Sequence, residues 1–155
     1  MDIADELNVS KTLVSLVLNG KGDAGSISKE TQKKVLDKAK ELQYKPNQVA
    51  RGLRTGTTKT IGLLVADISN PFFGRITRII EYYADQEGYQ LIVSSSDEDP
   101  EREKKLIRML VNRQVDGMII SSTAESPDQI NQVMTQNIPL VLIDRFYTEL
   151  HCNYV

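Results

Sequence analysis

Short apolar runs alternate with amphipathic segments along residues 60–145, and this alternation limits the possible folds more than any other feature. The run from Ile61 to Ala66 is continuously apolar, as expected for a parallel strand that is covered on both faces. Three further runs, QLIVSSS, VDGMIISS and PLVLIDR, have helical patterns between them. The repetition predicts an α/β doubly wound parallel sheet over residues 60–155, with the last residues, HCNYV, as the middle of the next strand.

The helices of this region have apolar stripes at helical spacing. The predicted buried faces are Ile76, Ile79, Ile80 and Tyr83 in residues 74–88, and Leu106, Ile107, Leu110 and Val111 in residues 97–114. Ligands of such sheets bind outside the carboxyl ends of the strands. We therefore expect a small-molecule site in the segments that follow the strands, namely 67–73, 94–97, 121–123 and 144–145.

The first 46 residues have the pattern of three short helices. Ile3, Ala4 and Leu7 form the apolar stripe of the first helix. Ser10 offers a hydroxyl to the free backbone N–H groups of a second helix, which ends at Asn19-Gly20. The second helix buries Val14, Val17 and Leu18. Two short helices joined by a tight turn predict a helix-turn-helix.

A third helix follows a glycine-rich loop, and a fourth, shorter segment follows Pro46. Ser28 caps the third helix, whose predicted buried stripe is Val35, Leu36, Ala39 and Leu42, while lysines cover its other faces. Pro46 prevents simple continuation of that helix. Asn47 can cap a last segment, QVARGLR, in which Gly52 disfavours helix by about 1 kcal/mol relative to Ala. This segment is marginal alone and needs a packing partner.

Charge is distributed unevenly along the 155 residues. Residues 1–60 contain 11 Lys and Arg against 7 Asp and Glu, whereas residues 61–155 contain 8 against 14. A basic first third favours a module that meets a polyanion, although chance variation between two solvated surfaces explains it equally well. No run is apolar enough to span a bilayer, and Cys152 is the single cysteine. We therefore expect a cytoplasmic protein without disulfides and without membrane contact.

Three stretches together are more specific than any of these patterns. DIADELNVSKTLVSLVLNGKG, ISKETQKKVLDKAKELQYKPNQVARGLRTG and TIGLLVADISNPFF resemble the start of a LacI/GalR-family transcription regulator. The resemblance implies a DNA-binding head at residues 1–46, a hinge helix and linker at 47–59, and a partial periplasmic-binding-protein-like sensor at 60–155. It also implies that the chain is truncated, because similar regulators continue through another subdomain and hold the effector between the two halves.

The resemblance assigns DNA-binding roles to residues of the head and hinge. In such regulators the second helix enters the major groove, where Lys11, Thr12, Ser15 and Leu16 would face base edges. Ser10, Leu13, Asn19, Ser28 and Thr31 match positions near phosphates. The hinge residues Asn47, Ala50, Leu53 and Arg54 match minor-groove positions, and Leu53 matches the leucine that wedges between base steps. A purely structural reading remains open for Leu53, which could close the core of the head.

Leu16 departs from the family pattern, which often has arginine at this position. Arginine can make two hydrogen bonds to guanine, whereas leucine can only touch a thymine methyl group or another apolar edge. We predict a different base preference at this position. The alternative is that Leu16 packs against Tyr44 or another core neighbour and reads no base.

The same resemblance suggests effector-binding residues in the sensor. Asn70 could hydrogen-bond a hydroxyl group, Phe72 or Phe73 could stack on a ring, and Asp144 with Arg145 could clamp polar groups. Each has a structural alternative: Asn-Pro is common in turns, the phenylalanines could belong to the core, and Asp144 and Arg145 could pair with each other. The implied effector is a sugar or sugar phosphate.

The sequence thus favours a transcriptional regulator, implied to be a repressor, that binds near-palindromic double-stranded DNA as a homodimer. The alternative is a sugar-binding module with a non-functional head. An enzyme is disfavoured because no phosphate-binding glycine loop follows the first strand. His151 and Cys152 are adjacent and would point to opposite faces of a strand. We expect no cofactor and no metal, since one His and one Cys are too few for a zinc site.

Overall fold

The computed structural model describes residues 3–44, 52, 56–123 and 127–155. The chain forms two compact units, residues 1–47 and residues 48–155, and each is described by itself. We refer to them as the head and the sensor. The predicted hinge helix, residues 47–54, lies outside the described residues except for Gly52.

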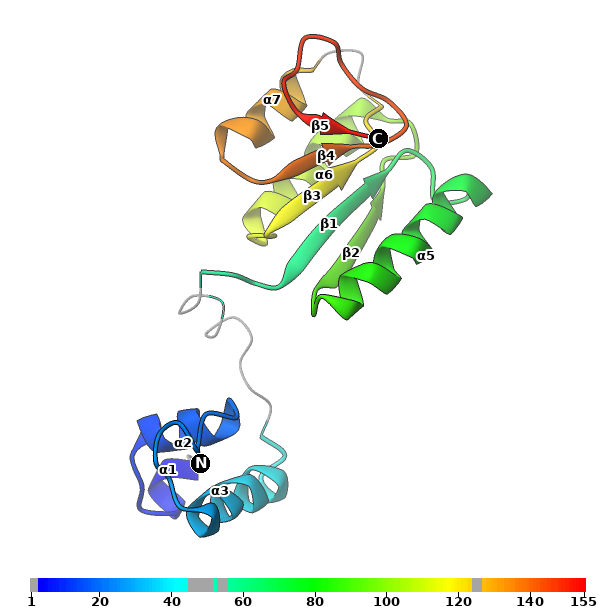
Figure 1. Ribbon diagram of the computed structural model, residues 1–155. Coiled ribbons are helices and arrows are strands. Elements are labelled where there is room, and N and C mark those ends of the chain that lie inside the picture. The colour runs from blue at the N-terminus through cyan, green and yellow to red at the C-terminus, as the bar shows by residue number, and fades with distance from the viewer. Residues whose placement is uncertain (1–2, 45–51, 53–55, 124–126) are drawn as a thin grey trace. The chain divides into compact units, whose positions relative to one another are not determined.

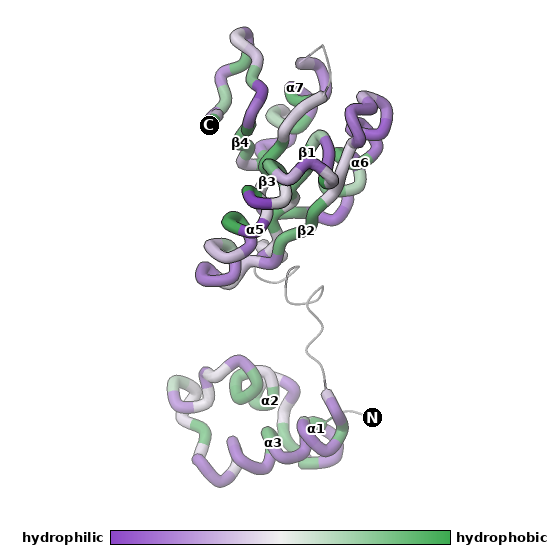
Figure 2. Tube along the Cα trace, turned by 90° about the vertical axis from the view of Figure 1, so that its right-hand side faces the viewer, coloured by the Kyte–Doolittle hydropathy of each residue, from purple (hydrophilic) through white to green (hydrophobic). Residues whose placement is uncertain are grey.

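Three helices form the head: α1 (Ile3–Glu6), α2 (Lys11–Leu18) and α3 (Lys29–Glu41). Their buried apolar side chains form one small core, composed of Ile3, Ala4, Val14, Val17, Val35 and Ala39. Figure 2 shows that most of α3 is hydrophilic, so a narrow stripe holds it to the other two helices. The predicted helix-turn-helix pair is therefore present as α1 and α2, with α3 packed against both.

One residue of the predicted stripe on α3 lies elsewhere. Leu36 is 50% exposed, whereas its neighbour Val35 is fully buried. The small core contacts only one narrow side of α3, and Leu36 lies a full 100° around the helix from Val35. On the same helix, the Lys38 ammonium lies 3.0 Å from the Glu6 carboxylate and 2.8 Å from that of Glu41. The pair with Glu6 ties α3 to α1, whereas the pair with Glu41 lies within α3.

The sensor contains a five-stranded parallel sheet with the order β2-β1-β3-β4-β5. The strands are β1 (Thr60–Val65), β2 (Gln90–Ser95), β3 (Gly117–Ile120), β4 (Leu140–Leu142) and β5 (Asn153–Tyr154). The first strand therefore lies inside the sheet, paired on both sides. The predicted strand at the end of the sequence is present as β5, which pairs with β4.

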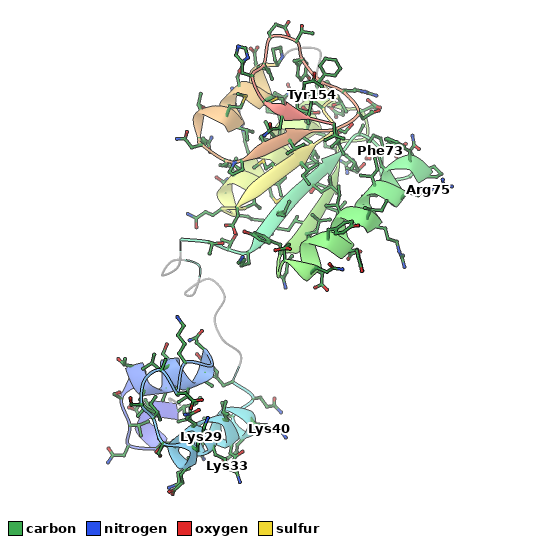
Figure 3. All side chains as sticks on the ribbon, in the orientation of Figure 1. Lys29, Lys33, Lys40, Phe73, Arg75 and Tyr154 are labelled. Carbon is green, nitrogen blue, oxygen red and sulfur yellow. The ribbon has the colours of Figure 1, made fainter. Side chains whose placement is uncertain are left out.

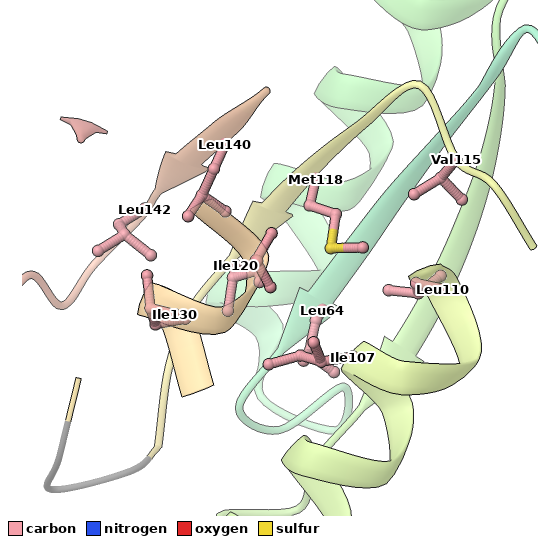
Figure 4. Close-up of a cluster of buried hydrophobic side chains, with 10 residues drawn as sticks. Leu64, Ile107, Leu110, Val115, Met118, Ile120, Ile130, Leu140 and Leu142 are labelled. Carbon is pink, nitrogen blue, oxygen red and sulfur yellow. The ribbon is translucent and has the colours of Figure 1, made fainter. Parts of the chain in front are cut away.

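Helices cover both faces of this sheet (Figure 1). They are α5 (Pro71–Gln86) on one face, and α6 (Pro100–Asn112) and α7 (Asp128–Thr135) on the other. Alternate residues of β1 face the two layers: Leu63 and Val65 pack in the cluster with Phe73, whereas Leu64 packs with residues from α6 and α7. Figure 4 shows this second cluster, in which Leu64, Ile107 and Leu110 lie close together. The doubly wound sheet expected from the sequence is thus confirmed.

The predicted apolar stripe of α5 is only partly buried. Ile76 and Ile80 pack against the sheet, but Ile79 is 58% exposed and Tyr83 is 62% exposed. The apolar surface of α5 is wider than the contact that two short strands can cover. Among the described residues, no helix combines the length and apolar composition that crossing a membrane requires.

Candidate nucleic-acid interface and effector site

One side of α2 is polar and exposed, and it carries the residues predicted to meet DNA. Lys11, Thr12 and Ser15 are exposed there, while Val14 and Val17 on the opposite side are buried in the head core. The Ser10 hydroxyl accepts a hydrogen bond of 3.1 Å from the Leu13 backbone N–H, so it caps the start of α2. At the end of α2, the Asn19 side-chain amide donates to the Ser15 carbonyl over 2.7 Å.

The two leucines predicted at this interface have different surroundings. Leu13 is half-buried and packs against the head core. Leu16 is also half-buried, and its Cδ1 atom lies 3.0 Å from the place where a Cβ on Gly25 would stand. Leu16 therefore contacts the loop between α2 and α3. This contact leaves part of its side chain on the exposed face of α2.

That loop, residues 20–28, is fixed by side-chain bonds. Asp23 receives a 2.7 Å hydrogen bond from the Lys29 ammonium and a 2.8 Å bond from the Gln32 amide. The bond from Lys29 is the main reason that the pKa of Asp23 lies below its ordinary value. At the end of the loop, the Ser28 hydroxyl accepts a hydrogen bond from the Thr31 backbone N–H, 3.2 Å away. Ser28 and Thr31 thus lie together at the first turn of α3.

The head, residues 1–47, contains eight lysines against seven Asp and Glu, so its net charge is only +1. The lysines of α3 are exposed except Lys38, and Figure 3 marks Lys29, Lys33 and Lys40 on this helix. Two of the exposed lysines form ion pairs, Lys29 with Asp23 and Lys34 with Glu30. Such exposed pairs are weak and screened by salt. The side chains predicted at the minor groove, Asn47, Ala50, Leu53 and Arg54, lie outside the described residues.

In the sensor, the segments after the strands meet at one edge of the sheet, which we call the strand-end edge (residues 66–73, 96–99, 121–123 and 143–145). Asn70 caps α5, because its side-chain oxygen accepts a 3.0 Å hydrogen bond from the Phe72 N–H. Phe72 is 49% exposed and meets Phe73 edge-to-face, with 5.2 Å between ring centroids. Phe73 itself is 4% exposed and belongs to the core. The structure therefore corrects the expectation for Phe73, because the sheet already covers its ring.

Arg145 and Asp144 lie at the same edge, after β4. The Arg145 guanidinium makes two hydrogen bonds of 2.8 and 2.9 Å to the Glu98 carboxylate, and its Nε lies 3.7 Å from the Asp144 carboxylate. These bonds to Glu98 raise the pKa of Arg145 above its ordinary value. Glu98 was not predicted as part of a site. An effector that used Arg145 would share or replace this two-pronged contact.

A buried carboxylate joins three segments behind this edge. Glu103, on α6, is fully buried, and its oxygens accept hydrogen bonds from the Ser122 hydroxyl at 2.8 Å and from the Thr123 N–H and hydroxyl at 2.5 and 2.8 Å. Ser122 also bonds to the Tyr147 hydroxyl over 2.8 Å. Burial raises the pKa of Tyr147, and the charge of Glu103 adds to that effect. The run EREKK reads as a solvated surface, so only the fold reveals Glu103.

Each of the two units matches a known protein family. Residues 1–47 match the model of bacterial regulatory proteins of the lacI family. Residues 58–152 match the model described as periplasmic binding proteins and sugar binding domain of LacI family.

Curated and solved relatives agree with these matches. The chain is 39% identical over 154 residues to the HTH-type transcriptional regulator KdgR of Bacillus subtilis, covering 99% of this chain and 45% of that protein. A structure of the Lac repressor dimer bound to operator and the anti-inducer ONPF has a TM-score of 0.81 at 27% identity, over 99% of this chain and 46% of that one. A LacI family regulator from Lactobacillus casei with bound sucrose has a TM-score of 0.54 at 30% identity, over 62% and 35%. The chain thus spans about half the length of these relatives.

Proposed function

Because the chain belongs to the LacI family of bacterial regulators, we propose that it is a sequence-specific transcriptional repressor that acts in the cytoplasm. The observation that carries the proposal is the exposed polar side of α2, held on a buried three-helix core. A helix presented in this way suits the major groove, where side chains reach base edges. Lys11, Thr12, Ser15 and Leu16 are the proposed base-reading residues.

The polar groups around α2 are suited to phosphate contacts. Ser10, Ser28 and Thr31 lie at the starts of α2 and α3, where helix N-termini and hydroxyls favour anions. Asn19, the C-cap of α2, offers a side-chain amide instead. Leu13 packs on the core, so only its backbone is available for such a contact. We include Asn47, Ala50, Leu53 and Arg54 in the interface on the strength of the family alone.

We further propose that a carbohydrate-type effector binds at the strand-end edge. Asn70, exposed Phe72, Asp144 and Arg145 are the proposed contacts, and Phe73 supports Phe72 from the core. Exposed aromatic rings and paired polar groups suit the apolar faces and hydroxyl groups of a sugar. Effector binding would shift the population of the sensor between two states and so change operator affinity.

Homodimer formation would explain a near-palindromic operator, since two heads would meet two half-sites. The exposed large side chains Ile79, Tyr82 and Tyr83 of α5 support self-association. Tyr82 and Tyr83 contact each other edge-to-face, with 5.3 Å between ring centroids.

The proposal is tested by selection from a random duplex library with the 155-residue chain at two salt concentrations. We expect a near-palindromic winner whose affinity falls steeply with salt, because phosphate contacts release counterions. Absence of any enriched sequence would overturn the proposal for this chain. Binding of a sugar without binding of DNA would favour instead a sugar-binding module with a non-functional head.

A further inference from the structure

Asp116 lies immediately before β3, and its carboxylate accepts hydrogen bonds from the segment that leads into β1. One oxygen accepts from the Thr57 hydroxyl and from the Lys59 N–H, the latter at 2.8 Å. The other oxygen accepts from the Thr58 N–H at 2.8 Å and the Thr58 hydroxyl at 3.1 Å. Residues 57–59 are thus gathered around a single side chain that is 57 to 59 positions away in the sequence.

This arrangement requires an ionised carboxylate. Three donors, the Thr57 hydroxyl and the N–H groups of Thr58 and Lys59, converge on two oxygens, and the Thr58 hydroxyl is shared with the Gln114 carbonyl, 2.9 Å away. A carboxylate is the side-chain group that only accepts hydrogen bonds. An asparagine would place an N–H₂ group against at least one backbone N–H, and two donors cannot bond to each other. Burial raises the pKa of Asp116, but the bonds from Thr57, Thr58 and Lys59 together outweigh it and hold the pKa below its ordinary value.

The backbone continues the same attachment. The Asp116 N–H donates to the Thr60 carbonyl over 2.8 Å, and the Gln90 N–H donates to the Lys59 carbonyl over 2.8 Å. The Lys59 ammonium also lies 4.1 Å from the centre of the Tyr89 ring, a favourable cation–π contact. Residues 57–59 are therefore fixed to two neighbouring strands before β1 begins.

We propose that Asp116 is the positioning residue that sets where the connection to the head leaves the sensor. This inference rests on the proposed DNA-binding function, and it assigns a role in that function to a side chain that touches neither DNA nor effector. With residues 57–59 held, two heads of a dimer start from fixed points and lose less freedom when they occupy two half-sites. Without the hydrogen bonds to Asp116, residues 57–59 are no longer held, and each head can reach a wider range of positions. The protein then discriminates less between operators that differ in the spacing of their half-sites.

The test uses the 155-residue chain, the operator selected as above, and variants of that operator with one to four base pairs inserted between the half-sites. For Asp116→Asn we expect about tenfold weaker binding to the selected operator. The preference for the selected spacing over the inserted ones should also fall by about tenfold. Binding to a duplex with one half-site should be unchanged, because a single head needs no fixed starting point.

Two further measurements separate positioning from damage to the fold. Trypsin should cleave after Lys59 faster in Asp116→Asn than in the wild type. In the wild type, residues 57–59 must break their hydrogen bonds to the Asp116 carboxylate before the protease can bind them, and the variant lacks this carboxylate. Glu87→Gln removes an equal charge from an exposed position at the end of α5 and should match the wild type in every assay. Should Asp116→Asn fail to fold, Thr57→Ala combined with Thr58→Ala removes the two hydroxyl donors without touching the sheet.

The outcomes are distinct. If the wild type enriches no operator, the proposed function is overturned and this role with it. If the wild type binds its operator and Asp116→Asn keeps the same spacing preference, the positioning role alone is wrong. Equal loss of half-site and full-operator binding would also contradict it, because that pattern indicates a damaged head.

Discussion

At the scale of single residues, Leu16 is the apolar member of an otherwise polar surface. Its side chain is half-buried against the loop at Gly25, yet it shares the exposed side of α2 with Thr12 and Ser15. Leu16 therefore packs locally while part of its side chain reaches the surface, and base reading by Leu16 stays a prediction. The neighbour that the structure shows is Gly25, in the loop between α2 and α3.

Leu16→Arg should change base preference at one symmetric pair of operator positions. Arginine can donate two hydrogen bonds to a guanine, whereas leucine can only contact an apolar base edge. We expect about 10- to 100-fold discrimination in favour of guanine at that pair, measured by repeating the duplex selection. Leu16→Met, which remains apolar, serves as the control. A selected operator identical at every position in Leu16→Arg and wild type would refute base reading at Leu16.

Asp116 predicts a specific dependence of stability on pH. Its pKa is lower in the folded chain than in the unfolded chain, so its contribution is present above the unfolded value near 3.8 and is lost as the pH falls through the folded value. At pH 7, Asp116→Asn should lower the free energy of unfolding by about 1–2 kcal/mol. Urea titrations should show this difference shrinking toward pH 3. A difference that stays constant between pH 7 and pH 3 would contradict the ionised anchor.

At the scale of elements, β1 and α6 approach each other more closely than their sequences indicate. A Cβ built on Gly62 would lie 2.9 Å from Leu110 Cδ1, and Leu110 is fully buried. Glycine here permits close packing of the helix on the strand. The continuous apolar pattern of β1 did not reveal this, because periodicity identifies the faces of an element but not the distance between elements.

Gly62→Ala should therefore destabilise the sensor by about 1–3 kcal/mol through overpacking. In the background of Leu110→Ala, the same change should be nearly neutral, because the new methyl group enters the space that Leu110 left. Gly74→Ala is the matched control: nothing lies within 4 Å of its Cβ position on α5, and alanine should stabilise that helix by up to about 1 kcal/mol. Additive effects of Gly62→Ala and Leu110→Ala would show that the two positions do not interact.

Sequence patterns predicted the elements well and their surroundings less well. Apolar runs located β1 to β4, and serine hydroxyl caps located the starts of α2 and α3. Exposure of Leu36, Ile79 and Tyr83 was missed, because a stripe of apolar residues does not state how much of it a partner will cover. The Glu103 and Asp116 networks were missed for another reason: each joins residues at least 19 positions apart, and neither leaves a periodic signal.

At the scale of the whole molecule, the chain combines two units with separate cores. The head is held by a small core and by ion pairs, whereas the sensor has one apolar cluster on each side of a sheet. In the proposed scheme, two copies of the chain associate and bring two heads to one operator. The exposed apolar side of α5 is the proposed surface between the two copies, so pairing of the heads depends on it.

Ile79→Asp should weaken self-association by about tenfold or more, since it places a charge among exposed apolar side chains. Affinity for the full operator should fall with it, while affinity for a single half-site should not. Analytical ultracentrifugation at several concentrations measures the first effect. Asn131→Asp, an equally exposed change on α7, is the control. Unchanged association in Ile79→Asp would exclude α5 from the contact between copies.

The position of β1 within the sheet has a mechanical consequence. Any tension that bent or moving DNA exerts along the connection reaches the sensor at β1, which pairs over six residues with β2 and over four with β3. Parallel neighbours on both sides oppose such a pull in shear, so many hydrogen bonds must break together. A pull on β5, the edge strand that pairs with β4 over two residues, would break fewer hydrogen bonds. The sensor therefore resists tension most strongly at β1, the strand through which the DNA-binding unit would pull on it.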